Sequence, residues 1–119
     1  MTPEELKKRT FQAAVRVVQF VRRLPSEPRT WSIGRQLLDS GTSQAAQYRA
    51  ACRGQSPRDF IAKMKRMEEE TDEAALWLGL LQATGLPPAL DAEAACLSRE
   101  FAELTAIAVA SIKTARRSL

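Results

Sequence analysis

Acidic side chains form the densest group of candidate ligands in the sequence. Glu68, Glu69 and Glu70 are consecutive, and Asp72 and Glu73 follow directly. Carboxylate oxygens bind hard cations, but the ligands of one ion must converge from several elements. Consecutive residues instead fan around a single helix. We therefore interpret the cluster as a solvated or intersubunit charged face, and we predict no metal site and no cofactor.

The histidine and cysteine content of the sequence does not favour catalysis. Histidine is absent, which removes the usual general base, the usual zinc ligand and the Glu-x-x-His pairs of di-iron bundles. Cys52 and Cys96 are far apart and lack CxxC spacing, so we expect buried free thiols that behave as small hydrophobic residues. The sequence predicts a protein that is not an enzyme. An enzymatic function would require acids such as Glu70, Asp72 and Glu73 to converge.

Length and composition are typical of one soluble helical domain. The chain has 119 residues, of which 45% are hydrophobic, 27% charged and 6% aromatic. This length is enough for one core, so we predict a single domain over residues 1–119. No charged and then apolar leader opens the sequence, and no apolar run approaches the roughly 18 residues that span a bilayer. A cytoplasmic location is the expectation.

Charge is unevenly distributed along the chain. Residues 1–66 hold fourteen Lys or Arg and five acids, a net +9, whereas residues 67–119 hold four and nine, a net −5, within a total of +4. Such a chain can pair with itself or offer a basic surface to a polyanion. A candidate basic rim for RNA or DNA phosphates comprises Arg49, Arg53, Arg58, Lys63, Lys65 and Arg66. Solvated helix faces, or salt bridges to a neighbouring subunit, are the alternatives.

Hydrophobic periodicity and helix-end residues predict four helices. Their expected ranges are Pro3 to Leu24, Thr30 to Arg53, Pro57 to Thr84 and Pro88 to Arg117. Thr2 and Ser56 are the expected N-caps. Gly54 is the expected left-handed residue after the second helix, and Gly85 is expected to end the third. Short connections between long helices make neighbours antiparallel. The predicted fold is all-α, an antiparallel up-down-up-down four-helix bundle.

The first helix carries two apolar seams. One consists of Leu6, Thr10, Ala13, Val17, Phe20 and Leu24, and the other of Phe11, Ala14, Val18 and Val21. A helix that packs in one bundle usually needs a single stripe. We therefore predict that the second seam forms an oligomer interface. An unusually well-covered core helix is the alternative.

The second helix combines small and polar residues with apolar ones. Gly34, Gly41 and Ala45 would let another backbone come close, while Trp31 is expected to pack with the neighbouring aliphatic residues. Such a seam favours specificity in assembly.

Several segments together resemble a bacterial family of small four-helix-bundle proteins named for members encoded in intervening sequences of 23S ribosomal RNA genes. The resemblance covers the chain from about Leu6 to Arg116. The positions that carry it are Gln36-Leu37-Leu38, Ser40-Gly41-Thr42-Ser43, Tyr48-Arg49, Ser56, Phe60-Ile61, Lys63, Glu70, Asp72-Glu73, Trp77-Leu78 and Ala110-Ser111-Ile112-Lys113-Thr114-Ala115. Relatives of this family are similar to the accessory protein of diversity-generating retroelements, a basic, barrel-like pentamer that works with a reverse transcriptase and nucleic acid.

The resemblance implies a non-catalytic homopentamer that binds RNA or DNA without reading its sequence. This chain departs from the family pattern at Asp39, Gln47 and Ala50, where a basic residue, Asn and Glu are common. Asp39 removes positive charge from the second helix, which weakens the expectation of nucleic-acid binding and leaves the bundle unaffected. The alternative is a structural module that presents charged faces to a protein partner. Salt-dependent retention of RNA or DNA separates the two.

Overall fold

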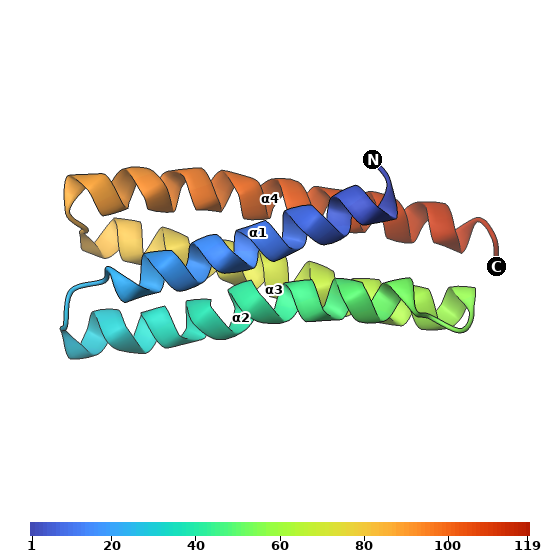
Figure 1. Cartoon of the computed structure of the whole chain (residues 1–119), viewed down its shortest axis with the longest axis horizontal. Helices are drawn as coiled ribbons and strands as arrows, with labels where there is room; N and C mark the ends of the chain where they lie inside the picture. The colour runs from blue at the N-terminus through green and yellow to red at the C-terminus, as the bar shows by residue number, and fades with distance from the viewer.

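Four antiparallel helices make up the structure, a computed structural model that describes residues 1–119. They are α1 (Pro3–Arg22), α2 (Pro28–Cys52), α3 (Pro57–Thr84) and α4 (Pro88–Arg116), and there is no strand. The bundle measures 47 × 22 × 21 Å. Each helix packs against the next, and α1 also contacts α4 (Figure 1). The predicted all-α four-helix bundle is confirmed.

Each helix begins with proline, whose fixed φ suits the first helical turn. The predicted caps at Thr2 and Ser56 are confirmed, because their hydroxyls accept bonds from the backbone of Glu5 and Asp59. The second helix begins earlier than predicted. The Glu27 carboxylate caps it by accepting bonds from the backbone N–H of Arg29 (3.3 Å) and Thr30 (3.0 Å). These bonds also lower the pKa of Glu27.

Gly54 was predicted to be left-handed, but the residue with a positive φ, of 100°, is Gly85 at the end of α3. The prediction for Gly54 was wrong. A Cβ at Gly54 would lie 3.0 Å from the Ala51 carbonyl oxygen and 3.2 Å from the Phe60 backbone nitrogen. Glycine is therefore needed at position 54 because the turn passes close to the start of α3.

One cluster of buried residues runs the length of the bundle. It includes most of the first seam of α1, and Phe20, Met64 and Leu78 are almost completely buried. Near the end of α4, Ile112 is buried while Ser111 and Ala115 are half-buried. The reason is that α1 begins at Pro3, so the last turns of α4 extend beyond it (Figure 1).

Close contact between α1 and α2 depends on glycine. A Cβ at Gly41 would lie 2.8 Å from Val17 Cγ2, and one at Gly34 would lie 2.8 Å from Leu24 Cδ1. Gln44 crosses this contact, and its Nε2 donates to the carbonyl oxygens of Thr10 (2.8 Å) and Gly41 (3.1 Å). Its Oε1 is buried without a hydrogen-bond partner. The expected close approach in this seam is therefore an intrachain contact.

On its other side, α1 is joined to α4 by ion pairs. Arg9 donates from Nε and Nη2 to the two carboxylate oxygens of Glu100, each at 2.8 Å, and Nη2 also lies 3.1 Å from Glu103. Arg16 reaches Glu93 at 3.1 Å. The guanidinium of Arg9 lowers the pKa of Glu100, with its hydrogen bonds as the main cause. A bidentate pair fixes both distance and orientation.

The first prediction concerns Gln44. We expect Gln44→Met to leave the stability of the protein unchanged or to raise it by about 1 kcal/mol, since it removes a buried acceptor that lacks a partner. Urea unfolding followed by circular dichroism measures this, with the half-buried Gln47→Met as control. A loss of more than about 1 kcal/mol would mean that the two Nε2 bonds outweigh the unpaired Oε1.

The second prediction concerns the Arg9–Glu100 pair. Because the folded-state pKa of Glu100 is below the ordinary value of 4.5, its contribution is complete above pH 4.5 and is lost as the pH falls through the folded-state pKa. We expect Glu100→Gln to cost on the order of 1 kcal/mol at pH 7, and the difference from the wild type to shrink below pH 4.5. Glu103→Gln, whose side chain is 64% exposed, serves as control and should change little. A pH-independent difference would show that packing, not charge, is what Glu100→Gln removes.

Candidate interaction surfaces

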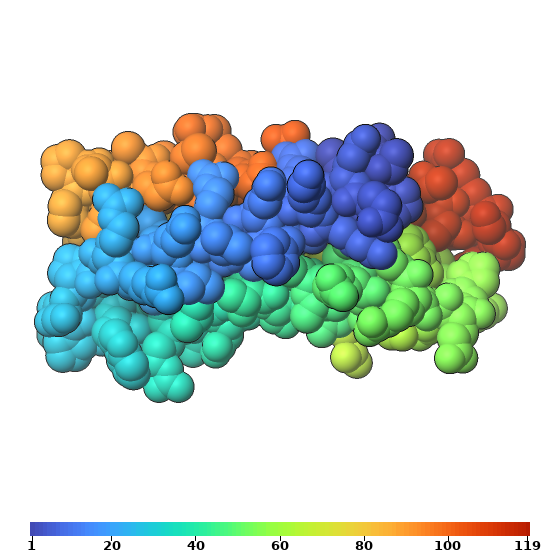
Figure 2. Space-filling model, viewed as in Figure 1, coloured from blue at the N-terminus to red at the C-terminus, as the bar shows by residue number.

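The second apolar seam of α1 is only partly covered. Phe11 is 61% exposed, while Ala14, Val18 and Val21 are half-buried beside α2. Val15, which the sequence reasoning missed, is 38% exposed and lies one turn from Phe11. Figure 2 looks onto α1, with α2 along one side of it and α4 along the other. The seam therefore lies on the outer surface of the bundle.

The neighbouring part of α2 extends this apolar surface. Trp31, which was expected to pack with the neighbouring aliphatic residues, is only partly covered, and its side chain is 58% exposed. The Arg35 guanidinium lies 5.0 Å from the centre of the Trp31 ring, a cation–π contact. We use the name α1/α2 face for the surface formed by Phe11, Val15, Val18, Val21, Trp31 and Leu38.

A hollow of about 270 Å³ opens on the α1/α2 face. Apolar side chains from both helices line it, among them Val21, Leu24, Trp31 and Leu38, and Gly34 also borders it. Arg35 lies at its edge as the one charged side chain in the lining. The hollow can accept an aliphatic side chain from another molecule.

The six residues of the predicted basic rim lie at one end of the bundle, around the connection between α2 and α3. Lys63 pairs with Asp59 at 3.0 Å, and Lys65 pairs with Glu68 at 3.4 Å. The other four, Arg49, Arg53, Arg58 and Arg66, are exposed, and no ion pair engages them.

The antiparallel topology brings further basic residues to this end. Lys7 and Lys8 from the start of α1, and Lys113, Arg116 and Arg117 from the end of α4, join the predicted six. We use the name basic end for residues 1–8, 49–66 and 113–119, which hold eleven of the 18 basic residues and three of the 14 acids, a net +8. The rest of the chain therefore carries a net −4. Sequence order alone had hidden the contribution of α4, because its cations lie in the acidic half of the chain.

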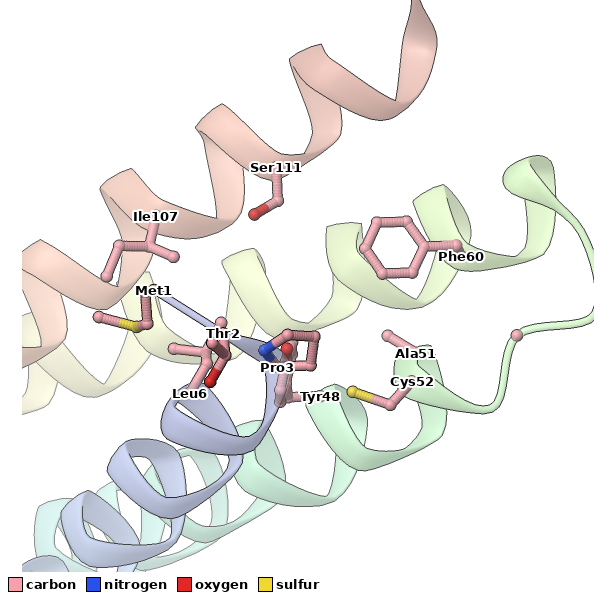
Figure 3. Close-up of a pocket in the computed structure, with 11 residues that line it drawn as sticks. Met1, Thr2, Pro3, Leu6, Tyr48, Ala51, Cys52, Phe60, Ile107 and Ser111 are labelled. Carbon is pink, nitrogen blue, oxygen red and sulfur yellow. The ribbon is translucent and has the colours of Figure 1, made fainter. Parts of the chain in front are cut away.

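An apolar pocket of about 420 Å³ lies at the basic end, where α1 begins (Figure 3). Leu6, Ala51, Phe60 and Ile107 line it together with Tyr48, and no charged side chain does. Burial is the main cause that raises the pKa of Tyr48, and the Cys52 thiol adds to it, so the phenol stays neutral at physiological pH. No side chain that lines the pocket therefore offers a charge to a phosphate group.

The groups that could perform chemistry are dispersed. The two cysteines are free, but the expectation that both are buried was wrong: Cys52 is half-buried, and Cys96 is exposed and accepts a hydrogen bond from Arg16 Nη2 at 3.1 Å. No group of three or more His, Cys, Asp or Glu side chains is placed to hold a metal ion. None of the helices is long and apolar enough to span a bilayer.

A second exposed apolar group lies on α3. Leu76 is 55% exposed and Leu80, one turn later, is 37% exposed. The preceding turns carry the exposed acids Glu69 and Asp72, and Glu73 accepts a bond from Trp77 Nε1 at 3.1 Å. We use the name α3 ridge for Leu76 and Leu80 with these three acids. Sequence reasoning missed the ridge, although the four-residue spacing of two leucines outside the core stripe was visible.

The acidic cluster of α3 is a charged helix surface. Burial raises the pKa of Glu70, and the nearby carboxylates of Glu73, Glu69 and Asp39 raise it further. The like charges of these acids repel one another, so a cationic partner would relieve the repulsion.

The fold and sequence are similar to those of a solved protein structure. No family model matches the chain, and no curated protein matches it. Among solved structures, a protein of unknown function from the S23 ribosomal protein family of Bacteroides thetaiotaomicron superposes with a TM-score of 0.83. It is 29% identical, and the match covers 95% of this chain and 99% of that one. Over nearly its whole length, this protein is thus similar in fold and sequence to a member of the S23 ribosomal protein family.

Proposed function

We propose that this protein is a non-catalytic homo-oligomeric scaffold that assembles through the α1/α2 face and binds RNA or DNA through its basic end. The observation that carries the proposal is the exposure of Phe11, Val15 and Trp31 on one side of a bundle whose core is otherwise complete. Large apolar side chains exposed on one side of a bundle favour an interaction partner there.

The basic end supports the second part of the proposal. Four unpaired arginines and the cations of α1 and α4 surround one end of the bundle, where they would attract phosphates. Phe11 is the one large exposed aromatic residue beside them, next to Lys7, Lys8 and Arg49. Binding would therefore depend mainly on charge and would not read sequence. The solved relative belongs to a family named for a ribosomal protein, which is compatible with an RNA partner.

The proposed number of subunits is five. This number comes from the resemblance to the intervening-sequence family and to the retroelement accessory protein. It is the finer part of the proposal. A protein partner in place of nucleic acid is the second candidate, and the apolar α1/α2 face is the feature that would favour it.

The third prediction tests assembly. Phe11→Glu and Val18→Glu, made singly, should raise the dissociation constant of the oligomer by roughly 30-fold or more, since each places a charge in a buried apolar contact. Light scattering measures the mass, and circular dichroism should show unchanged helicity. Leu119→Glu, at an exposed apolar residue outside the face, is the control. If the wild type is a monomer at micromolar concentration, the assembly part of the proposal is wrong.

The fourth prediction tests nucleic-acid binding. Purified protein should retain RNA or DNA at physiological ionic strength, and affinity should fall steeply as salt is added. The double variant Arg49→Gln/Arg53→Gln should weaken binding and reduce the slope of log affinity against log salt by about one to two. Arg22→Gln/Arg23→Gln, at the opposite end of the bundle, is the matched control. Absence of retention by the wild type would favour the protein-interaction alternative.

A further inference from the structure

We propose that the α1/α2 face of one subunit binds the α3 ridge of the next, so that assembly uses two different surfaces in a head-to-tail ring. This inference rests on the proposed function and names the second half of its interface. A closed ring with an odd number of subunits cannot be built from contacts between two identical patches. A pentamer therefore requires a second patch, and the structure offers one.

Both surfaces offer apolar side chains to a partner. The hollow between α1 and α2 has a volume of about 270 Å³ and apolar walls formed by Val21, Trp31 and Leu38. The α3 ridge presents Leu76 and Leu80, which are 55% and 37% exposed. Insertion of these leucines would bury apolar surface on both partners and cover Trp31.

The two surfaces are also complementary in charge. Glu69, Asp72 and Glu73 precede the leucines of the α3 ridge. On the opposite surface, Arg35 stacks on Trp31 at the edge of the hollow. Docking would bring Arg35 near the acidic turns and relieve their mutual repulsion. An α1/α2 face paired with its own copy would instead bring Arg35 close to a second Arg35 around one hollow.

The hollow and the α3 ridge also lie at similar positions along the long axis of the bundle. Trp31 lies in the first turn of α2, and Leu80 lies near the end of α3, so the antiparallel topology places both toward the end opposite the basic end. A contact between them lets neighbouring bundles lie side by side without a large shift along their axes.

A mixing experiment tests the inference. Leu76→Glu/Leu80→Glu removes the α3 ridge, and Trp31→Glu removes the hollow. Each variant alone should be monomeric by light scattering, with its helicity retained. An equimolar mixture should form a one-to-one heterodimer and stop there, because each molecule keeps only one functional surface and the ring cannot close. Leu119→Glu is the control and should assemble like the wild type.

The outcomes separate this inference from the proposed function. If the wild type assembles and Leu76→Glu/Leu80→Glu still assembles fully, the head-to-tail pairing is wrong while the oligomeric scaffold stands. Failure of the two monomeric variants to combine would also overturn the pairing. A monomeric wild type would remove the proposed assembly together with this inference. Because both altered positions are exposed in the single subunit, loss of helicity would contradict their assignment to an external surface.

Discussion

The rotation of α1 about its own axis determines which surfaces the bundle exposes, and that rotation is held from two sides. On the α2 side, Val17 lies against Gly41, where even a methyl group would clash. On the α4 side, Arg9 donates hydrogen bonds to both carboxylate oxygens of Glu100. Because α1 contacts α2 along one side and α4 along another, only its remaining side is available for the second apolar seam. That side is the outer surface next to α2, which is where Phe11 and Val15 are exposed.

Because the helices are antiparallel, the distribution of charge in the bundle differs from its distribution along the chain. By chain order, the first 66 residues are basic and the remainder acidic. In the bundle, Arg22, Arg23 and Arg29 lie at the end opposite the basic end. Lys113 and Arg116, from the acidic half of the chain, lie at the basic end. The result is a molecule with a charge gradient along its long axis.

Much of the fold could be predicted because the determinants are local. Four prolines with Thr2 and Ser56 before two of them mark helix starts, and the core stripes follow the helical period. The misses have non-local causes. Gly54 avoids a clash with Phe60 of the next helix, Trp31 is exposed because α1 ends before it can cover α2, and Cys96 lies outside the α4 stripe near Arg16. The secondary-structure propensity of a residue contains no information about such contacts.

The candidate surfaces could be predicted to a smaller extent for the same reason. The seam of Phe11, Ala14, Val18 and Val21 was recognisable because its residues share one helix side. The hollow beside Trp31 and the meeting of four helix ends at the basic end require the distances between helices. Leu76 and Leu80 were overlooked because they lie among acids, although that setting is what makes the α3 ridge complementary to a face with Arg35.

Cyclic assembly would connect the apolar surfaces to the basic end. A rotation axis parallel to the bundles leaves the direction of each bundle unchanged, so every basic end would lie on the same side of the ring. One basic end, with a few unpaired arginines, would bind phosphates weakly at physiological salt. Several of them held at fixed spacing would bind one polyanion together, with the second and later contacts strengthened by a high effective concentration. In this scheme the apolar contacts supply the geometry, and the charge at each end becomes effective only in the assembled ring.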